Sequence, residues 1–399
     1  MIRIIVDTQS NQLFRGIEME QEYDQRGGLC QVGAGHIVVT TNPIDQEYLE
    51  YWQELGFSLP TLLVAGPFDP RYTLSELIIS KPALQKEILS LVKGRPARLE
   101  FFYIEESEKK LAEVLGIPPY CNFKVSIPLS RKVAFKQVCQ QISLPTPSWK
   151  ICHTKKALLE KGRSFLDKGK RVLIKTNTGT GGLACGGMEK AESIRELEET
   201  VSSIDLEKGP FVIEELIEEK MADVAIHWEI TPDRHLHIIG LFNQFSTNFS
   251  YQGSSFPVQI PFPLQELIKK QLKEKLFPYL LERKALGYFC CDIVIDKEGN
   301  PYWVDFNPRK GAILYVYDMT RRLSNIRFGG KKVYFWHEHC KFPGKEKNKT
   351  SFRFIKTLLS DFLTPHPPFV VITNPGIIRF GYVDITDISL NSIEVFLKL

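Results

Sequence analysis

Short apolar runs alternate with amphipathic stretches along the first 125 residues. The amphipathic stretches, at residues 46–55 and 107–115, have the spacing of helices with one buried face. A strand–helix–strand rhythm is typical of a parallel sheet with crossover helices, so this part of the chain predicts an α/β domain. The β-branched and aromatic runs that predict its strands lie at residues 2–6, 36–41, 61–65 and 97–103.

The pattern changes after residue 125. Ser130 can cap a helix that has one apolar face and that stops before Pro145. The polar stretch at 243–257, rich in Gly and Ser, predicts a mobile loop. Strands are predicted at 171–175, 211–217, 222–230, 235–242, 369–372 and 377–383, and helices at 194–201 and 264–281.

Composition narrows the class of protein. With 399 residues, the chain is long enough for two or three packed units. The 51 basic and 47 acidic residues give a net charge of only +4, which argues against a nucleic-acid partner. No run of about 18 apolar residues predicts a membrane span, and no secretory segment opens the chain. Eight cysteines without a C-x-x-C pair favour free thiols and a cytoplasmic protein.

Residues 287–311 carry the most informative chemistry. They read as two strands joined by a tight turn, with Asp292 in the first strand and Asp305 and Asn307 in the second. Residues two apart on a strand share a face, so Asp305 and Asn307 point the same way. Oxygen ligands that converge across a hairpin predict a Mg²⁺ site, and Mg²⁺ usually accompanies a nucleotide phosphate.

Three further elements fit a nucleotide. Lys132 lies in the helix after Ser130, and Lys175 ends a strand before the glycine-rich stretch TNTGTGG. Lysines supply charge to phosphates, and a glycine-rich loop lets backbone N–H groups wrap them. The strand end from Glu214 to Ile217 can read an adenine edge. The candidate nucleotide contacts are Lys132, Lys175, Thr178, Gly179, Thr180, Gly181, Gly182, Glu214, Glu215 and Ile217, with Glu218, Glu219 or Asp223 for the ribose.

Taken in order along the chain, these elements resemble the ATP-grasp superfamily. The similar features are a lysine one helix before Leu144-Pro145, the segment VLIK before a glycine loop, and a strand ending EELI. A fourth similar feature is the succession of an acid, Asp292, a DKEGN turn, an aromatic strand and the run from Asp305 to Arg309. The resemblance implies an ATP-grasp fold with subdomains at 126–220 and 221–399, behind a Rossmann-like pre-ATP-grasp domain at 1–125.

A second resemblance is to the pre-ATP-grasp peptide ligases, the group that includes the pheganomycin-type ligase. It rests on TTNPIDQEYLEYW, EKKLAEVLGIPPY and NPRKGA. It implies a ligase that joins a carboxylate to an amine, such as amino acids or short peptides, through an acyl phosphate, with release of ADP and phosphate. ATP and Mg²⁺, or Mn²⁺ in its place, are the implied cofactors, and a homodimer is the analogous assembly. In this scheme Arg309 holds the carboxylate or acyl-phosphate oxygens, and Lys310 assists.

Some features depart from these patterns or allow other interpretations. Asp305 stands where the family commonly has Glu, and Ala312 replaces a usual second glycine. An ATP-grasp kinase and a nucleotide-binding regulatory protein are the alternative functions. The run from His337 to Cys340 could bind zinc, but a surface or packing role is favoured because it lacks a second ligand pair. The glycines at 27–35 favour an ordinary connection over a dinucleotide loop.

Overall fold

The computed structural model describes residues 1–6, 28–67, 69, 71–177, 188–247 and 249–328, followed by five short strand segments between 335 and 381. The chain forms two compact units. The first contains Met1–Tyr120, Gly253–Phe256 and Gly311–Leu399, and the second contains Cys121–Gln252 and Pro257–Lys310. The predicted boundaries at residues 125 and 220 stay predictions.

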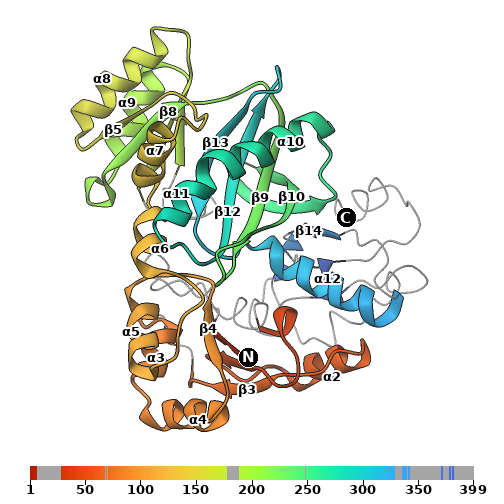
Figure 1. Ribbon diagram of the computed structural model, residues 1–399. Helices are drawn as coiled ribbons and strands as arrows, with labels where there is room; N and C mark the ends of the chain where they lie inside the picture. The colour runs from red at the N-terminus through yellow and green to blue at the C-terminus, as the bar shows by residue number, and fades with distance from the viewer. Residues whose placement is uncertain are drawn as a thin grey trace. The chain divides into compact units, whose positions relative to one another are not determined.

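The first unit is built on a parallel four-stranded sheet (Figure 1). Its order is β3-β2-β1-β4, and every neighbouring pair is parallel. This confirms the predicted Rossmann-like α/β domain. The four strands are β1 (Ile2–Val6), β2 (Ile37–Thr40), β3 (Thr61–Val64) and β4 (Ala97–Phe101), each within two residues of its predicted bounds.

Helices of the first unit include two that the sequence predicts and two that it does not. The predicted ones are α2 (Gln46–Glu54) and α5 (Glu106–Leu115). The others are α3 (Leu74–Ile79) and α4 (Pro82–Val92). Both carry start signals, because Thr73 and Glu76 form a capping box for α3 and Pro82 opens α4.

Later parts of the chain also belong to the first unit. Helix α12 (Ile313–Phe328) is held to residues 28–32 by Arg322, whose guanidinium donates to the carbonyls of Leu29, Cys30 and Val32 at 2.7–3.2 Å. Residues Gly253–Phe256 of β11 (Ser250–Phe256) pair with β14 (Phe335–Glu338). The described residues of this unit also form two small antiparallel pairs: β15 (Cys340–Lys341) with β17 (Ile377–Ile378), and β16 (Val370–Val371) with β18 (Phe380–Gly381).

The second unit contains two sheets. The smaller is antiparallel, in the order β5-β8-β6-β7, and its core includes residues of α8 (Lys155–Leu166) and α9 (Ile194–Ser203). Gly162 lets these two helices approach, since a Cβ there would lie 2.5 Å from a methyl of Leu197. The strands are β5 (Trp149–Cys152), β6 (Val172–Thr176), β7 (Met188–Ala191) and β8 (Phe211–Glu215), and a 3₁₀ turn, η3 (Leu206–Lys208), precedes β8.

The larger sheet of this unit has strands β13-β12-β9-β10 in that order (Figure 1). One face of this sheet packs on the continuous helical run formed by α10 (Phe262–Gln271), η4 (Leu272–Leu276) and α11 (Phe277–Glu282). On that face the rings of Trp228, Phe289 and Phe306 stack, with 5.7–6.0 Å between ring centres. The other face carries the polar residues described below. The other elements are β9 (Lys220–Ile230), β10 (Leu236–Thr247), β12 (Gly287–Asp296) and β13 (Pro301–Asn307), with α6 (Phe123–Leu129) and α7 (Lys132–Gln141).

Two local predictions are wrong. The stretch at 243–257 is not a loop, because β10 continues to Thr247 and β11 follows; its Gly and Ser residues sit in strands that a propensity argument disfavours. Ser130 does not cap the start of α7. It ends α6 instead, and its hydroxyl donates to the carbonyl of Ile127 at 2.8 Å.

Within the described residues, no helix combines the length and the apolar character that a membrane span needs. The six cysteines whose state is described are buried free thiols, as expected.

Candidate functional site

The β12–β13 hairpin places the predicted metal ligands side by side. Asp292 lies directly opposite Asp305, and Cys290 lies opposite Asn307. The turn before β13 is closed by Asp296, which accepts from the backbone N–H of Gly299 through its carbonyl and from Asn300 through its carboxylate. The predicted convergence of two acids and an amide on one face of the hairpin is therefore present.

Asp292 is the more perturbed of the two acids. Burial raises its pKa to about 6, and the neighbouring charge of Asp305 adds to the rise. Gln244 of β10 donates to Oδ1 of Asp292 at 2.8 Å, and this hydrogen bond lowers the pKa and so opposes the rise. A carboxyl group held this way gains from any cation that binds beside it.

Lys132 neutralises the other acid. Its Nζ lies 2.7 Å from Oδ2 of Asp305, and the lysine is almost fully buried. The first turn of α7 is fixed by Asn177, which follows β6: its carbonyl accepts from the N–H of Lys132 and its side chain from the N–H of Val133, both at 3.0 Å. Asn177 thus does the capping that the sequence assigned to Ser130.

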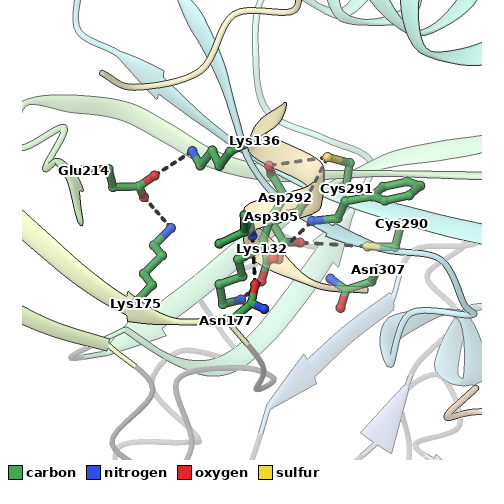
Figure 2. A network of polar contacts seen from close by, with 12 residues as sticks. Lys132, Lys136, Lys175, Asn177, Glu214, Cys290, Cys291, Asp292, Asp305 and Asn307 are labelled. Carbon is green, nitrogen blue, oxygen red and sulfur yellow. Dashed lines mark hydrogen bonds and ion pairs between the residues drawn. The ribbon is translucent and has the colours of Figure 1, made fainter. Parts of the chain in front are cut away.

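A second ion cluster lies between α7 and the smaller sheet (Figure 2). Glu214 of β8 has one carboxylate oxygen 2.5 Å from Nζ of Lys175 and the other 2.6 Å from Nζ of Lys136. The Lys136 contact is an ion pair without the alignment of a hydrogen bond to Oε2. Lys136 also donates to the hydroxyl of Thr146 at 2.5 Å. All three charged side chains are at most 5% exposed.

The pKa values in this cluster respond to both burial and charge. Burial alone would raise the pKa of Glu214, but the two lysines lower it. Burial lowers the pKa of Lys136. For Lys175, the attraction of Glu214 and of the two aspartates outweighs burial and raises the pKa.

Sequence reasoning missed Lys136 and Asn177. Lys136 had a readable signal, since it lies four residues after Lys132 and so shares its helix face, which also bears Phe135 and Cys139. Asn177 had none, because its role depends on where β6 meets α7.

The remaining acids of the predicted nucleotide site lie outside both clusters. Glu215 pairs with Lys170 at 2.6 Å, Glu219 pairs with Lys297, and Asp223 pairs with Lys220 at 2.7 Å. Glu218, the further ribose candidate, pairs with Arg171.

The strand end differs from its prediction as well. Strand β8 ends at Glu215, so half-buried Ile217 lies beyond it. The backbone N–H groups of Glu215 and Leu216 already donate to Ser148 and Arg171 carbonyls at 2.9 Å. Thr178, Gly179, Thr180, Gly181 and Gly182 lie outside the described residues.

The end of β13 brings the predicted substrate residues to the same region. Asn307 accepts through Oδ1 from Arg309 at 3.0 Å, and Arg309 also donates to the carbonyl of Lys310. Lys310 is buried, with Nζ 5.0 Å from the ring centre of Tyr288. Beside Asn307, Sγ of Cys290 lies 3.5 Å from Nε2 of His227.

Nowhere among the described residues do three His, Cys, Asp or Glu side chains gather to hold a metal ion. The candidate site on the hairpin does not meet this criterion, because only two of its three ligands are acids and the third is the amide of Asn307. His339 and the side chains around it are outside the described residues, and the zinc alternative stays untested.

The two units together define the class of fold. The first unit carries a parallel sheet, and the second carries two further sheets, with Lys175 on the smaller, Asp292 and Asp305 on the larger, and Lys132 on helix α7. This arrangement fits the predicted ATP-grasp fold. The family model described as "Pre ATP-grasp domain" matches residues 28–117, which lie in the first unit. This confirms the predicted pre-ATP-grasp domain.

Solved structures show the same fold over nearly the whole chain. The N5-carboxyaminoimidazole ribonucleotide synthetase of Thermus thermophilus is 13% identical, with a TM-score of 0.60, covering 100% of this chain and 97% of that one. The Thermotoga maritima enzyme is 16% identical, with a TM-score of 0.58 and coverages of 100% and 96%. The biotin carboxylase domain of Hydrogenobacter thermophilus 2-oxoglutarate carboxylase is 13% identical, with a TM-score of 0.60 and coverages of 96% and 86%. No curated protein sequence matches the chain.

Proposed function

We propose that this protein is an ATP-dependent ligase that joins a carboxylate to an amine and releases ADP and phosphate. The observation that carries the proposal is the pair of ion clusters in the second unit. One has two lysines around a single carboxylate, and the other has two aspartates around a single lysine. A buried positive surplus suits phosphate oxygens, and a surplus of acids suits a divalent cation. Solved proteins of this fold have been crystallised with ADP and with its magnesium salt.

The nucleotide would lie against the lysine-bearing elements. We propose that Lys132 and Lys175 contact its phosphates, together with Thr178, Gly179, Thr180, Gly181 and Gly182. Strand β8 supports an adenine site just beyond Glu215, near Ile217, because the earlier N–H groups are already used. Either Glu219 or Asp223 would accept the ribose hydroxyls, after leaving its present lysine partner.

The hairpin fits a magnesium ion. Asp292, Asp305 and Asn307 supply hard oxygen donors. Burial, and after it Asp305, raises the pKa of Asp292, so a cation bound there would stabilise its ionised form. Manganese suits the same donor set. When bound, the ion would neutralise charge on the phosphates. Lys132 holds Asp305 now and would be released toward a phosphate when the acid takes the metal.

The substrate chemistry then rests on Arg309. Its guanidinium is oriented by Asn307 and the Lys310 carbonyl, and a planar fork suits a carboxylate. The substrate carboxylate oxygen attacks the γ-phosphorus, and the bond to ADP breaks. The amine nitrogen then attacks the acyl carbon, phosphate leaves, and the nitrogen loses a proton. Lys132, Lys175 and Arg309 stabilise charge throughout, so no covalent enzyme intermediate is needed.

The substrate class is the finer part of the proposal. The resemblance to peptide ligases favours an amino acid or short peptide as both acid and amine. Buried free thiols fit an enzyme of the reducing cytoplasm.

A product assay on two variants tests this function. Lys175→Met and Asp305→Asn should each lower turnover about a hundredfold or more, the range for lost electrostatic stabilisation. The assay follows phosphate release with amino acids and dipeptides plus Mg-ATP, and mass spectrometry identifies the product. Matched controls are Lys156→Met and Asp167→Asn on the exposed surface of α8 and at its end.

The products separate the alternatives. An amide with ADP and phosphate supports the ligase, and a phosphorylated product without an amide identifies a kinase. AMP and pyrophosphate would rule out the acyl-phosphate route. Full activity in both site variants would overturn the residue assignment.

A further inference from the structure

Lys136 is the most deeply buried lysine of the second unit that the proposed mechanism does not use. Its side chain is 1% exposed, and α7 places it one turn after Lys132. Few proteins bury an ammonium group this far without a partner, and here the partner is Glu214 at 2.6 Å. Yet Glu214 already has a partner in Lys175 at 2.5 Å.

The charge count of this cluster is uneven. Glu214 and Lys175 alone would form a neutral buried pair, and Lys136 changes the total to one positive charge. Within the cluster this surplus has no carboxylate of its own, and it is offset only by the more distant attraction of Asp305 and Asp292 for Lys175. Burying such a surplus costs free energy. The surplus becomes favourable when an anion binds next to the cluster.

The geometry shows how Lys136 can act on Lys175. The two ammonium groups take different oxygens of one carboxylate, and Thr146 holds Lys136 from the other side at 2.5 Å. Glu214 is thereby fixed on both oxygens, and Lys175 is fixed through it.

We propose that Lys136 is a positioning residue for nucleotide binding. It offsets the charge of Glu214, so that Lys175 keeps its full attraction for the phosphates while Glu214 still orients it. This inference rests on the proposed function, in which Lys175 contacts a nucleotide phosphate. It adds a third lysine to the site, one that acts through Glu214 without touching the ligand.

A charge cycle in the full-length protein tests it. The variants are Lys136→Met, Glu214→Gln, and the two combined, with calorimetric titration of ADP and Mg²⁺ as the measurement. Cluster charge would be zero in the first, +2 in the second and +1 again in the double variant. We expect Lys136→Met to weaken ADP about tenfold or more, and the double variant to return to within about threefold of the wild type. Lys136→Arg should retain binding, since it keeps the charge.

A purely structural Lys136 gives a different result. If Lys136 only stabilised the fold, each variant that lacks it would have a lower melting temperature. The ADP affinity of the folded protein would not change. Wild-type affinity in folded Lys136→Met overturns the proposal, and so does a double variant no tighter than Lys136→Met. If Lys136→Met does not fold, Lys136→Gln replaces it, because its amide can still donate to Thr146.

Failure of the proposed function is distinguishable. In that case the wild type would not bind ADP, or Lys175→Met would bind as tightly as the wild type. Binding lost in Lys175→Met but unchanged in Lys136→Met would contradict this inference alone.

Discussion

Glu214 and Asp292 are both carboxyl groups inside the second unit, but their pKa values move in opposite directions. Two lysines lower the pKa of Glu214 in spite of burial, whereas burial and Asp305 raise that of Asp292 to about 6. The difference lies in the neighbours, since Glu214 has a cation on each oxygen and Asp292 accepts from an uncharged amide. Burial alone therefore does not tell what a carboxyl group does. The sign of the charge around it indicates which ligand completes the site.

The lysine-rich cluster should be the more costly to break. Glu214→Ala removes the carboxylate that both buried ammonium groups contact, which should lower the free energy of unfolding by about 3–5 kcal/mol. Urea denaturation followed by circular dichroism measures the change. The matched control is Glu198→Ala, whose pair with Arg163 is half exposed and should be worth about 1 kcal/mol or less. Equal effects at the two positions would show that burial adds nothing to the contribution of Glu214.

In the acid-rich cluster, removing a carboxylate should raise the stability of the fold instead of lowering it. The folded protein holds the Asp292 proton up to about pH 6, while the unfolded chain loses it near 3.8, so ionisation opposes folding as pH rises between these values. Without metal, Asp292→Asn should be more stable than the wild type above pH 6, by at most about 3 kcal/mol. The gain should vanish near pH 4.

Melting temperatures in a chelator from pH 4 to 8 check this pH dependence. Magnesium and ADP should then stabilise the wild type but not Asp292→Asn. A variant that is less stable than the wild type at every pH would show that Asp292 is a structural acid like Glu214.

The smallest effect is expected from a substitution that removes a contact of Lys136 but no charge from the lysine-rich cluster. Thr146→Val removes the hydroxyl that accepts from Lys136 but leaves every charge in place. Stability should fall by about 1.5–3 kcal/mol, the contribution of a hydrogen bond to a charged group. ADP affinity, measured by calorimetry beside Lys136→Met, should stay within about twofold. A loss as large as that of Lys136→Met would mean that geometry, not charge, sets affinity.

The sequence could reveal what depends on local spacing. Asp292, Asp305 and Asn307 were identifiable because alternation along two strands and a turn at Gly299 fix their relation. Lys132 and Lys175 were identifiable as charges at element ends. The pairing of Lys136 with Glu214 was not, because it joins a helix and a strand that are 78 residues apart in the sequence. The stretch at 243–257 was wrongly predicted as a loop, because the prediction rested on its Gly- and Ser-rich composition. The strand pairing that makes it β-structure depends on the fold.

The irregularity in the hairpin sets a limit on how this site can change. Asp292 lies opposite Asp305, but its neighbour Ile293 lies opposite Trp303, so Val304 is one residue more than the partner strand needs. That extra residue lets Trp303 and Phe306 both enter the core while Asp305 stays on the polar face. Substitutions at Val304 preserve this count, whereas a single-residue deletion would turn Asp305 or Trp303 to the wrong side. A change in the length of this strand would therefore disturb the core and the polar face together, whereas a substitution at Val304 leaves both in place.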